Sequence, residues 1–170
     1  MRTAIVTAIL ALPGTALVII PSLIVWATSD TPLAAQAATP SQTLFWVGLV
    51  FAVMGLALMA WTIVDFARIG KGTLAPWAAP KKLVVRGPYR HVRNPMICGA
   101  ILVLSAESLL LQSLPVAAWL LAFVAMNAIY IPLKEERGLE KRFGEDYRLY
   151  RDGVPRWVPR MRPWRGLDED

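Results

Sequence analysis

The sequence has almost none of the residues that bind metal ions or form disulfides. It contains one cysteine, Cys98, and one histidine, His91. A single cysteine excludes an internal disulfide framework. The two residues together also exclude a metal site built from several cysteine and histidine ligands, so we expect no metal ion.

Charge is absent from two long stretches, residues 4–27 and 44–64. Each reaches the about 20 apolar residues that a helix needs to cross a ~30 Å hydrocarbon core. The chain of 170 residues is 56% hydrophobic with a mean hydropathy of +0.47, which is too high for a soluble domain of this size. The composition therefore predicts a single integral membrane domain over residues 1–170.

The net charge of +6 does not indicate a nucleic-acid partner. The basic residues flank the apolar segments instead of forming a patch on a soluble surface. In a membrane protein, Lys and Arg accumulate in cytosolic loops and fix the orientation of the chain. We therefore expect membrane lipids as partners and no nucleic acid.

The charge pattern predicts an all-α integral membrane protein of about four transmembrane helices, with both termini in the cytosol. Four crossings place Arg2, the basic loop 66–94 and the charged tail 134–170 on one side. The first apolar run is longer than a signal-peptide core, which favours a retained span over a cleaved leader. The last two spans are joined by a short turn and should form a C-terminal antiparallel hairpin. The expected spans are residues 4–27, 44–64, 95–112 and 115–133.

The stretch from Arg86 to Gly99 holds more polar residues than membrane insertion requires. Asn94-Pro95 predicts a helix start, with Asn94 as the N-cap and Pro95 at the first helical position. The free N–H groups of this helix start, next to Arg93, form a natural anion site. Gly99 lies just over one turn inside and lets a helix or a ligand approach the backbone. The alternative is that the arginines only fix topology and Gly99 only serves helix packing.

A second stretch, residues 134–150, predicts a cytosolic amphipathic helix. On the helical wheel Glu136 falls near the centre of the apolar stripe and Glu135 at its edge. A carboxylate on the inward face needs a cationic partner. That partner is either an arginine of the first stretch or a cationic ligand. The apolar positions at helical spacing are Leu139, Phe143, Tyr147 and Tyr150.

Together the two stretches predict a pocket at the cytosolic mouth of the hairpin. Arg93 and the helix start would face the acidic pair Glu135 and Glu136. Such a pocket suits a zwitterionic molecule with separated charges. S-adenosylmethionine is one, because it carries a carboxylate, an ammonium and a sulfonium.

Glu107 is an acid inside a predicted span, which makes it a functional candidate by default. It lies near the opposite interface, beside Ser105, Ser108 and Gln112. With these polar neighbours, a hydrated helix end is the favoured interpretation over a functional site.

At the residues of the two polar stretches, the sequence resembles the isoprenylcysteine carboxyl methyltransferase and phospholipid methyltransferase superfamily of membrane enzymes. The resemblance covers residues 83–159 and rests on an ordered set of short motifs. These motifs are Lys82-Leu83-Val84, Gly87-Pro88-Tyr89, Arg93-Asn94-Pro95, Gly99, Glu135-Glu136, Leu139, Phe143-Gly144, Tyr147, Tyr150 and Val154-Pro155.

The resemblance implies a helical membrane enzyme that binds S-adenosylmethionine at the cytosolic end of the hairpin. Arg93 matches the arginine that opens the family's Arg-His-Pro motif, and Arg93 and Glu136 are the implied catalytic candidates. The implied cofactor-binding residues are Leu83, Val84, Tyr89, Asn94, Pro95, Met96, Ile97, Gly99 and Glu135.

Three positions depart from the family's pattern. The family's histidine is Asn94 here, which keeps a hydrogen-bonding group, and its tyrosine is Ile97, which lacks a hydroxyl. Ile131 replaces an arginine that helps hold the substrate in the eukaryotic prenylcysteine enzymes. The change at Ile131 argues against a prenylcysteine carboxylate as the acceptor.

We therefore expect methyl transfer from S-adenosylmethionine to a lipid or lipid-modified acceptor at the membrane–cytosol interface, similar to the isoprenylcysteine carboxyl methyltransferases. The sulfonium is already electrophilic, so the protein mainly aligns the reactants. An amine acceptor would have to lose a proton, with Glu135, Glu136 or Tyr89 as weak candidate bases. The alternatives are a phospholipid N-methyltransferase, a nicotinamide-dependent membrane reductase and a non-catalytic membrane scaffold.

Overall fold

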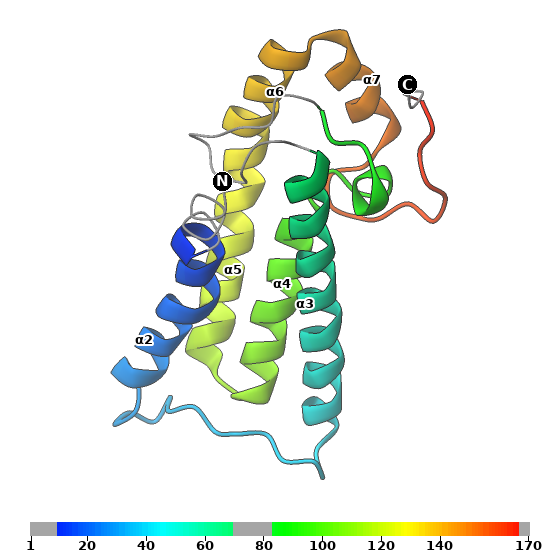
Figure 1. Cartoon of the computed structure of the whole chain (residues 1–170). Helices are drawn as coiled ribbons and strands as arrows, with labels where there is room; N and C mark the ends of the chain where they lie inside the picture. Colours follow the sequence, from blue (N-terminus) through cyan, green and yellow to red (C-terminus); the bar gives the residue numbers. More distant parts are fainter. Residues whose placement is uncertain (1–9, 70–82, 167–170) are drawn as a thin grey trace.

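The computed structural model describes residues 10–69 and 83–166, and every regular element in these ranges is helical (Figure 1). The all-α prediction is therefore confirmed. Residues 4–9 of the first predicted span and residues 70–82 of the predicted basic loop lie outside the described part. In chain order the elements are η1 (Leu10–Ile19), α2 (Ile20–Ala27), α3 (Thr43–Ile69), η3 (Gly87–Arg90), α4 (Pro95–Leu110), α5 (Leu114–Tyr130), η4 (Ile131–Glu135), α6 (Glu136–Phe143) and α7 (Glu145–Gly153).

Two of the described helices are long and apolar enough to cross a membrane. They are Thr43–Asp65 within α3 and Leu114–Phe143, which runs from α5 through η4 and α6. The apolar helices Pro13–Ala27 and Pro95–Leu110 are shorter. At ~1.5 Å per residue the 16 residues of α4 extend about 24 Å, less than a ~30 Å hydrocarbon core. Two of the four predicted spans thus meet the length criterion.

The outer faces of α3 and α5 expose large apolar side chains. Leu56 of α3 is 58% exposed, and Leu121 and Ile129 of α5 are 70% and 62% exposed. Large exposed apolar surfaces mark contact with a membrane or with another protein. The uncharged length of both helices favours the membrane.

Two segments are wound as π-helix instead of α-helix, and each contains a proline. Pro13 lies in η1 and Pro132 in η4. Proline has no N–H to donate, and its ring clashes with the carbonyl one turn earlier, so the local winding widens. In this way η4 joins α5 to α6 without ending the helix, and it carries Glu135 and Glu136 beyond the apolar part.

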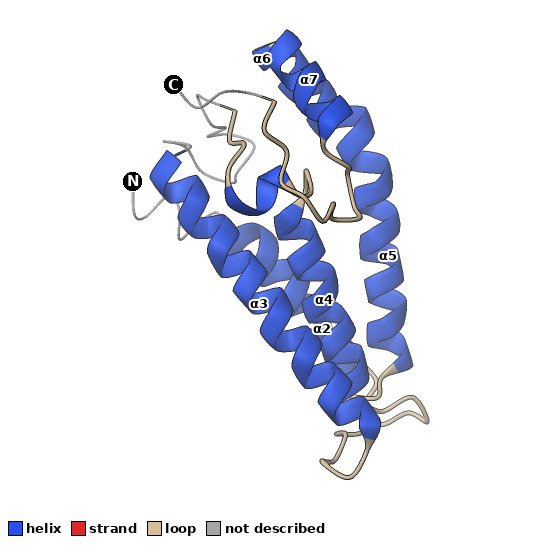
Figure 2. Cartoon of the chain, turned by 90° about the vertical axis from the view of Figure 1, so that its right-hand side faces the viewer, coloured by secondary structure: helices blue, strands red, loops and turns tan. Residues whose placement is uncertain are grey.

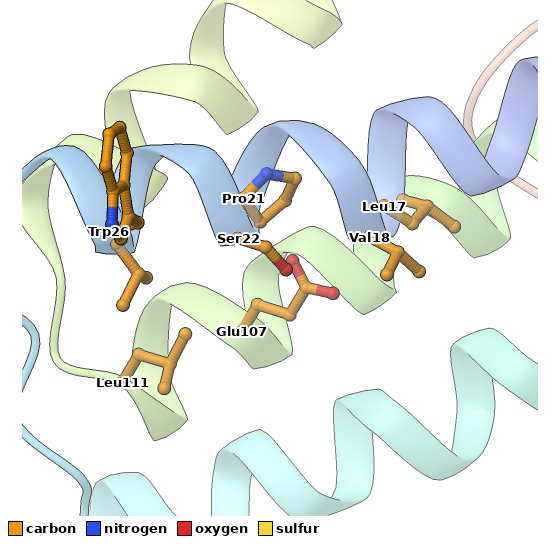
Figure 3. Close-up of a pocket in the computed structure, with 8 residues that line it drawn as sticks. Leu17, Val18, Pro21, Ser22, Trp26, Glu107 and Leu111 are labelled. Carbon is orange, nitrogen blue, oxygen red and sulfur yellow. The ribbon is translucent and has the colours of Figure 1, made fainter.

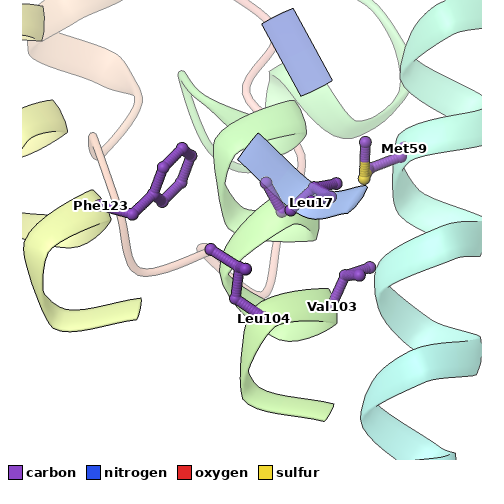
Figure 4. Close-up of a cluster of buried hydrophobic side chains, with 6 residues drawn as sticks. Leu17, Met59, Val103, Leu104 and Phe123 are labelled. Atoms are coloured by element: carbon purple, nitrogen blue, oxygen red, sulfur yellow. The ribbon is translucent and has the colours of Figure 1, made fainter. Parts of the chain in front are cut away.

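The hydrophobic core lies where η1, α3, α4 and α5 meet (Figure 4). The indole N–H of Trp119 in α5 donates to the carbonyl of Ala16 in η1 at 3.0 Å. This bond and the core side chains hold the first helix against the α4–α5 hairpin. The buried members are Leu17, Met59, Ala100, Val103, Leu104 and Phe123.

Glycines allow α3 and α4 to cross at short distance. A Cβ added to Gly55 of α3 would lie 2.8 Å from the carbonyl oxygen of Gly99, and one added to Gly99 would lie 2.7 Å from Met59 Cγ. Small residues at crossings are typical of membrane helices, whose association depends on close packing. Gly99 therefore contacts a helix, which is one of the two partners that the sequence allowed.

The α4–α5 hairpin closes through a tight turn at one end of the bundle. The hydroxyl of Ser113 accepts a hydrogen bond from the Val116 N–H at 3.4 Å and so caps α5. The loop 28–42 meets this turn, where the Gln36 N–H donates to the Leu111 carbonyl at 2.8 Å. Figures 1 and 2 show these loops at the end opposite α6 and α7.

The single amphipathic helix predicted over residues 134–150 is two helices with a corner between them. Gly144 forms the corner between α6 and α7 with φ 57° and ψ −125°, a conformation that glycine adopts without a steric penalty. The apolar side chains keep their helical spacing across the corner, so the sequence pattern did not reveal it. They gather in one cluster of Tyr147, Tyr150 and Val154, packed against Leu83, Val85, Leu139, Phe143 and Trp164.

Candidate functional site

The charged end of the bundle is organised around the start of α4. This helix begins at Pro95, as predicted, and the Asn94 carbonyl accepts the N–H of Cys98 at 3.0 Å. Asn94 is the N-cap residue, as predicted, although its side chain makes no capping hydrogen bond. Its amide instead donates to the carbonyl of Arg156 at 3.4 Å. Asn94 therefore joins the helix start to the C-terminal segment.

Glu136 lies between two arginines. Arg93 Nη1 donates to Glu136 Oε1 at 2.8 Å, while Arg156 binds both carboxylate oxygens at 2.7 and 2.8 Å. Glu136 is only 7% exposed, as its predicted position at the centre of the apolar stripe requires. Forked arginine–carboxylate pairs are among the strongest and most directional contacts in proteins. Of the two partners that the sequence allowed, the structure shows the arginine, together with a second one from the C-terminal segment.

Residues 154–164 form a strap that lies along the segment 89–98. The Arg93 N–H donates to the Pro155 carbonyl at 2.9 Å, which brings the strap next to the start of α4. In each of the bonds between the strap and this segment the strap contributes a backbone group, so these bonds hold its path whatever its side chains are. The other contacts join Arg160 N–H to the His91 carbonyl, Trp164 N–H to the Arg90 carbonyl, Arg90 Nε to the Trp164 carbonyl, His91 Nδ1 to the Arg160 carbonyl and Cys98 Sγ to the Trp157 carbonyl.

Tyr89 of η3 is buried next to Tyr150 of α7. Its carbonyl accepts the hydroxyl proton of Tyr150 at 2.8 Å. Burial raises the pKa of the Tyr89 hydroxyl well above its usual value, and the negative charges of Glu135 and Asp65 add to the shift. Tyr89 therefore stays protonated at neutral pH, which argues against the role of general base that the sequence left open.

Asp65, near the C-terminal end of α3, is a further acid at the charged end. A Cβ added to Gly87 would lie 2.5 Å from Asp65 Oδ2, so the glycine lets η3 close over this carboxylate. Gly87 also has a positive φ of 53°, which favours glycine. The Oδ2 atom is buried and has no hydrogen-bond partner among the described residues. Asp65 is thus an acceptor that can still take a cationic or N–H group.

Arg93 has a buried N–H donor that, like the Asp65 oxygen, lacks a hydrogen-bond partner among the described residues. Its Nη1 binds Glu136, but its Nε is buried and meets no acceptor in residues 10–69 and 83–166. A buried donor without a partner costs about 1–3 kcal/mol. It lies beside the N–H groups at the start of α4, which attract anions. The charged end thus holds a buried donor on Arg93 and a buried acceptor on Asp65, neither of which has a hydrogen-bond partner among the described residues.

The other candidate residues divide into two sets. Leu83 packs on the Tyr147 cluster, and Val84 is 5% exposed. Met96 and Ile97 pack against the core cluster between the helices. Glu135 is exposed, next to the buried Glu136. The structure thus brings Arg93, Asn94, Pro95, Tyr89 and Glu136 together at the charged end and places Gly99 against α3.

Two residues of this end were absent from the sequence-based candidates. Asp65 follows the predicted span 44–64 directly and was given no role, although a lone acid beside a basic loop was a usable signal. Arg156 follows the Val154-Pro155 motif directly, and the buried Glu136 required more cations than Arg93 alone.

The phospholipid methyltransferase family matches residues 43–146. This match runs from the start of α3 into α7 and includes Asp65, Arg93, Asn94 and Glu136. The chain belongs to the phospholipid methyltransferase family. No curated protein and no solved structure matched it.

Family membership confirms the resemblance seen in the motifs and places the chain in the superfamily that also holds the isoprenylcysteine carboxyl methyltransferases. It supports a membrane methyltransferase, in agreement with the two long apolar helices. The strap 154–164 lies beyond the matched residues, so its contacts with Glu136 and Asn94 are features that the structure adds.

Proposed function

We propose that this protein transfers a methyl group from S-adenosylmethionine to a lipid or lipid-modified acceptor at the membrane–cytosol interface. The observation that carries the proposal is the pair of unused polar atoms at the charged end, Arg93 Nε and Asp65 Oδ2. A ligand with one anionic and one cationic group satisfies both. The family match supplies the reaction class.

The residues present fit S-adenosylmethionine. Arg93 and the N–H groups at the start of α4 would hold its carboxylate, because both favour negative charge. Asp65 and Glu135 would face its ammonium or sulfonium, since both act on Tyr89 as nearby negative charges. The remaining expected contacts at this end are Leu83, Val84, Tyr89, Asn94 and Pro95.

When bound, the cofactor supplies a methyl group on a sulfonium that already reacts as an electrophile. The chain's own contribution is alignment, which is worth several kcal/mol when reacting atoms are held in line. Glu136 serves as a positioning residue, because both its oxygens are bound to arginines. It holds Arg93 and the strap in place and is a poor candidate for moving a proton.

Whether the site contains a general base bears on which class of acceptor it can methylate. A carboxylate or thiolate acceptor needs none, whereas an amine must first lose a proton. Glu135 is exposed and remains available for that step. Ile131, where the prenylcysteine enzymes have an arginine, is 1% exposed and packed inside the protein. This burial favours a phospholipid-type amine over a prenylcysteine carboxylate.

The proposal includes a multi-pass topology with four spans and both termini in the cytosol. In this arrangement α6, α7 and the strap lie at the cytosolic interface, and the loop 28–42 lies on the other side. The two shorter helices, Pro13–Ala27 and Pro95–Leu110, would cross with local thinning of the bilayer. Labelling of single cysteines placed at Ser41 and Glu145 in sealed vesicles tests it, since only one of the two should react from each side.

Binding of S-adenosylmethionine to the purified full-length protein, measured by calorimetry in a neutral detergent, tests the cofactor. Arg93→Lys keeps the charge but removes the Nε donor and should weaken binding at least about tenfold. Asp65→Asn should weaken it by a similar factor without breaking any hydrogen bond seen in the structure. Arg148→Lys on the exposed face of α7 is the matched control and should change nothing.

Absence of binding, or binding that ignores both changes, would sink the cofactor assignment. Binding of a reduced nicotinamide nucleotide instead would favour the reductase alternative, and binding of neither would favour the scaffold. Labelled S-adenosylmethionine offered with phosphatidylethanolamine vesicles or with a prenylated cysteine peptide then identifies the acceptor. We expect label in the phospholipid.

A further inference from the structure

A cavity lies at the end of the bundle away from the charged site. It has a volume of about 470 Å³ and lies between α2 and α4 (Figure 3). Fourteen residues separate Arg93 from Glu107 along the chain, which corresponds to roughly 20 Å of helix. A group held here does not reach the residues at the start of α4. The lining residues are Leu17, Val18, Pro21, Ser22, Val25, Trp26, Glu107 and Leu111.

Glu107 is the one ionisable residue in this lining. Figure 3 shows its carboxylate pointing between the two helices, toward Ser22. Its Oε2 atom is buried and has no hydrogen-bond partner in the described part of the chain. A buried carboxylate oxygen without a donor is costly, so a site that keeps one is expected to meet a cation or an N–H group.

The polar residues next to Glu107 are already engaged elsewhere. The Ser105 hydroxyl donates to the Ile101 carbonyl at 2.7 Å, and the Ser108 hydroxyl donates to the Ser105 carbonyl at 2.9 Å. The Gln112 amide donates to Gln42 Oε1 at 2.7 Å. These bonds direct the neighbouring donors away from Glu107, which weakens the interpretation as a hydrated helix end. Glu107 Oε2 has no partner among residues 10–69 and 83–166.

The rest of the cavity has the chemistry of a site for an organic cation with an apolar tail. Leu17, Pro21 and Leu111 provide apolar walls, and Trp26 provides an aromatic face that attracts cations. Trp26 is 76% exposed and Val18 is 61% exposed, so the cavity is bordered by surface that faces outward. A tail can therefore leave the cavity along the outside of α2, where the bilayer would be.

We propose that this cavity binds a membrane-soluble alkylammonium group, with the cationic head on Glu107 and Trp26 and the tail in the lipid. This site is separate from the proposed methyl-transfer site and goes beyond that function. The argument rests on charge complementarity and on the unpartnered Glu107 oxygen. Its ligand class is an amphiphile that carries a primary or quaternary ammonium.

Photolabelling in maltoside micelles tests the site. The probe is a dodecyltrimethylammonium carrying a photoreactive group at the end of its chain, and labelled peptides are mapped by mass spectrometry. We expect label within residues 13–27 or 101–114. Unlabelled dodecyltrimethylammonium and phosphatidylethanolamine should both compete, which compares a single-chain amphiphile with a quaternary ammonium and a two-chain lipid with a primary ammonium. Dodecyl sulfate should not compete, because its head group is an anion.

Three variants test separately the Glu107 carboxylate, the space in the cavity and the aromatic face of Trp26. Glu107→Gln should reduce labelling at least about tenfold. Ser22→Phe fills the cavity while keeping the charge and should reduce it similarly. Trp26→Leu should reduce it by about threefold through loss of the cation–aromatic contact. Binding of S-adenosylmethionine by these variants should equal that of the wild-type protein, which shows that they are folded and separates this proposal from the first.

Several results would overturn the proposal. Labelling that Glu107→Gln and Ser22→Phe both leave unchanged means that the cavity is not the site. Equal competition by dodecyl sulfate means that the head group's charge is not recognised. Equal competition by choline alone means that the ligand is a water-soluble cation and no lipid tail is involved.

Discussion

The two ends of the helical bundle each hold an acid with a buried carboxylate oxygen, but the two acids differ in their hydrogen-bond partners. At the charged end Glu136 receives three hydrogen bonds from Arg93 and Arg156. At the opposite end Glu107 keeps a buried oxygen with no partner among the described residues. One carboxylate is thus part of the architecture, and the other has its binding capacity unused.

This difference shows why burial alone is a poor guide to function. A buried charge with a complete set of partners fixes the chain, because removing either side leaves the other charge uncompensated. A buried polar atom without a partner adds no stability, which makes it a candidate for binding a ligand. By this criterion Arg93 Nε and Asp65 Oδ2 are the candidate binding groups of the charged end, and Glu136 supports Arg93.

The largest expected effect is the loss of Glu136. Glu136→Ala leaves two arginines near each other without their carboxylate, and the Arg93 side chain is only 10% exposed. Breaking a buried pair in this way costs about 3–5 kcal/mol of folding free energy. Thermal or chemical unfolding in a neutral detergent should show this loss. Glu145→Ala is the control, because its side chain is 71% exposed and its ion pair with Arg148 is a surface contact. Equal stability of the two variants would contradict the role given to Glu136.

The next largest expected effect is a loss of stability at the close crossing of α3 and α4. Gly55→Ala places a Cβ 2.8 Å from the Gly99 carbonyl oxygen, which is backbone and cannot move aside. We expect a loss of about 1–3 kcal/mol, as for other overpacked sites. Gly138→Ala in α6 is the matched control, because its Cβ would meet nothing within 4 Å. It should stabilise the helix by about 0.5–1 kcal/mol. Similar unfolding curves for the two variants would mean that α3 and α4 do not cross closely.

Glu107 should respond with the opposite sign to Glu136. Glu107→Leu removes a buried oxygen without a partner and adds apolar surface to an apolar cavity. The protein should become more stable by about 1 kcal/mol when no ammonium amphiphile is present. The same unfolding measurement checks it. A destabilisation as large as that of Glu136→Ala would show that Glu107 has a structural partner, and the contrast between the two ends would fail.

The sequence predicted the features that depend on local pattern. The uncharged stretches predicted helices, the short turn predicted the α4–α5 hairpin, and Asn94-Pro95 predicted the start of α4. Each of these follows from residues close together in the chain, where sterics and solvation act directly. The helical wheel also placed Glu136 on the buried face, because side-chain direction repeats with the helix.

The features that escaped prediction depend on the path of the chain in three dimensions. Arg156 is twenty residues from Glu136 and reaches it only because the chain turns at Gly144 and returns as the strap. Asp65 meets Gly87 through the packing of α3 on η3. No spacing rule connects such residues, so a sequence-based candidate list contained the acid without its second arginine. A requirement that every buried charge be paired would have indicated the missing partner.

The smallest expected effect is a pH dependence of stability that arises from Tyr147 at the charged end. Burial raises the pKa of Tyr147 at the charged end to about 12, with the negative charge of Glu136 adding to the shift. An unfolded tyrosine ionises near pH 10. Between about pH 10 and 12 the unfolded chain therefore releases this proton while the folded protein keeps it. The contribution of Tyr147 to stability is complete below pH 10 and is lost as the pH rises.

Tyr147→Phe should flatten the decline in melting temperature between pH 9.5 and 11, because phenylalanine has no proton to release. Phe143→Leu, which changes the same cluster but involves no titrating group, should leave the decline as it is. An equal decline in both variants would mean that Tyr147 ionises freely and that the cluster under the strap is open to water.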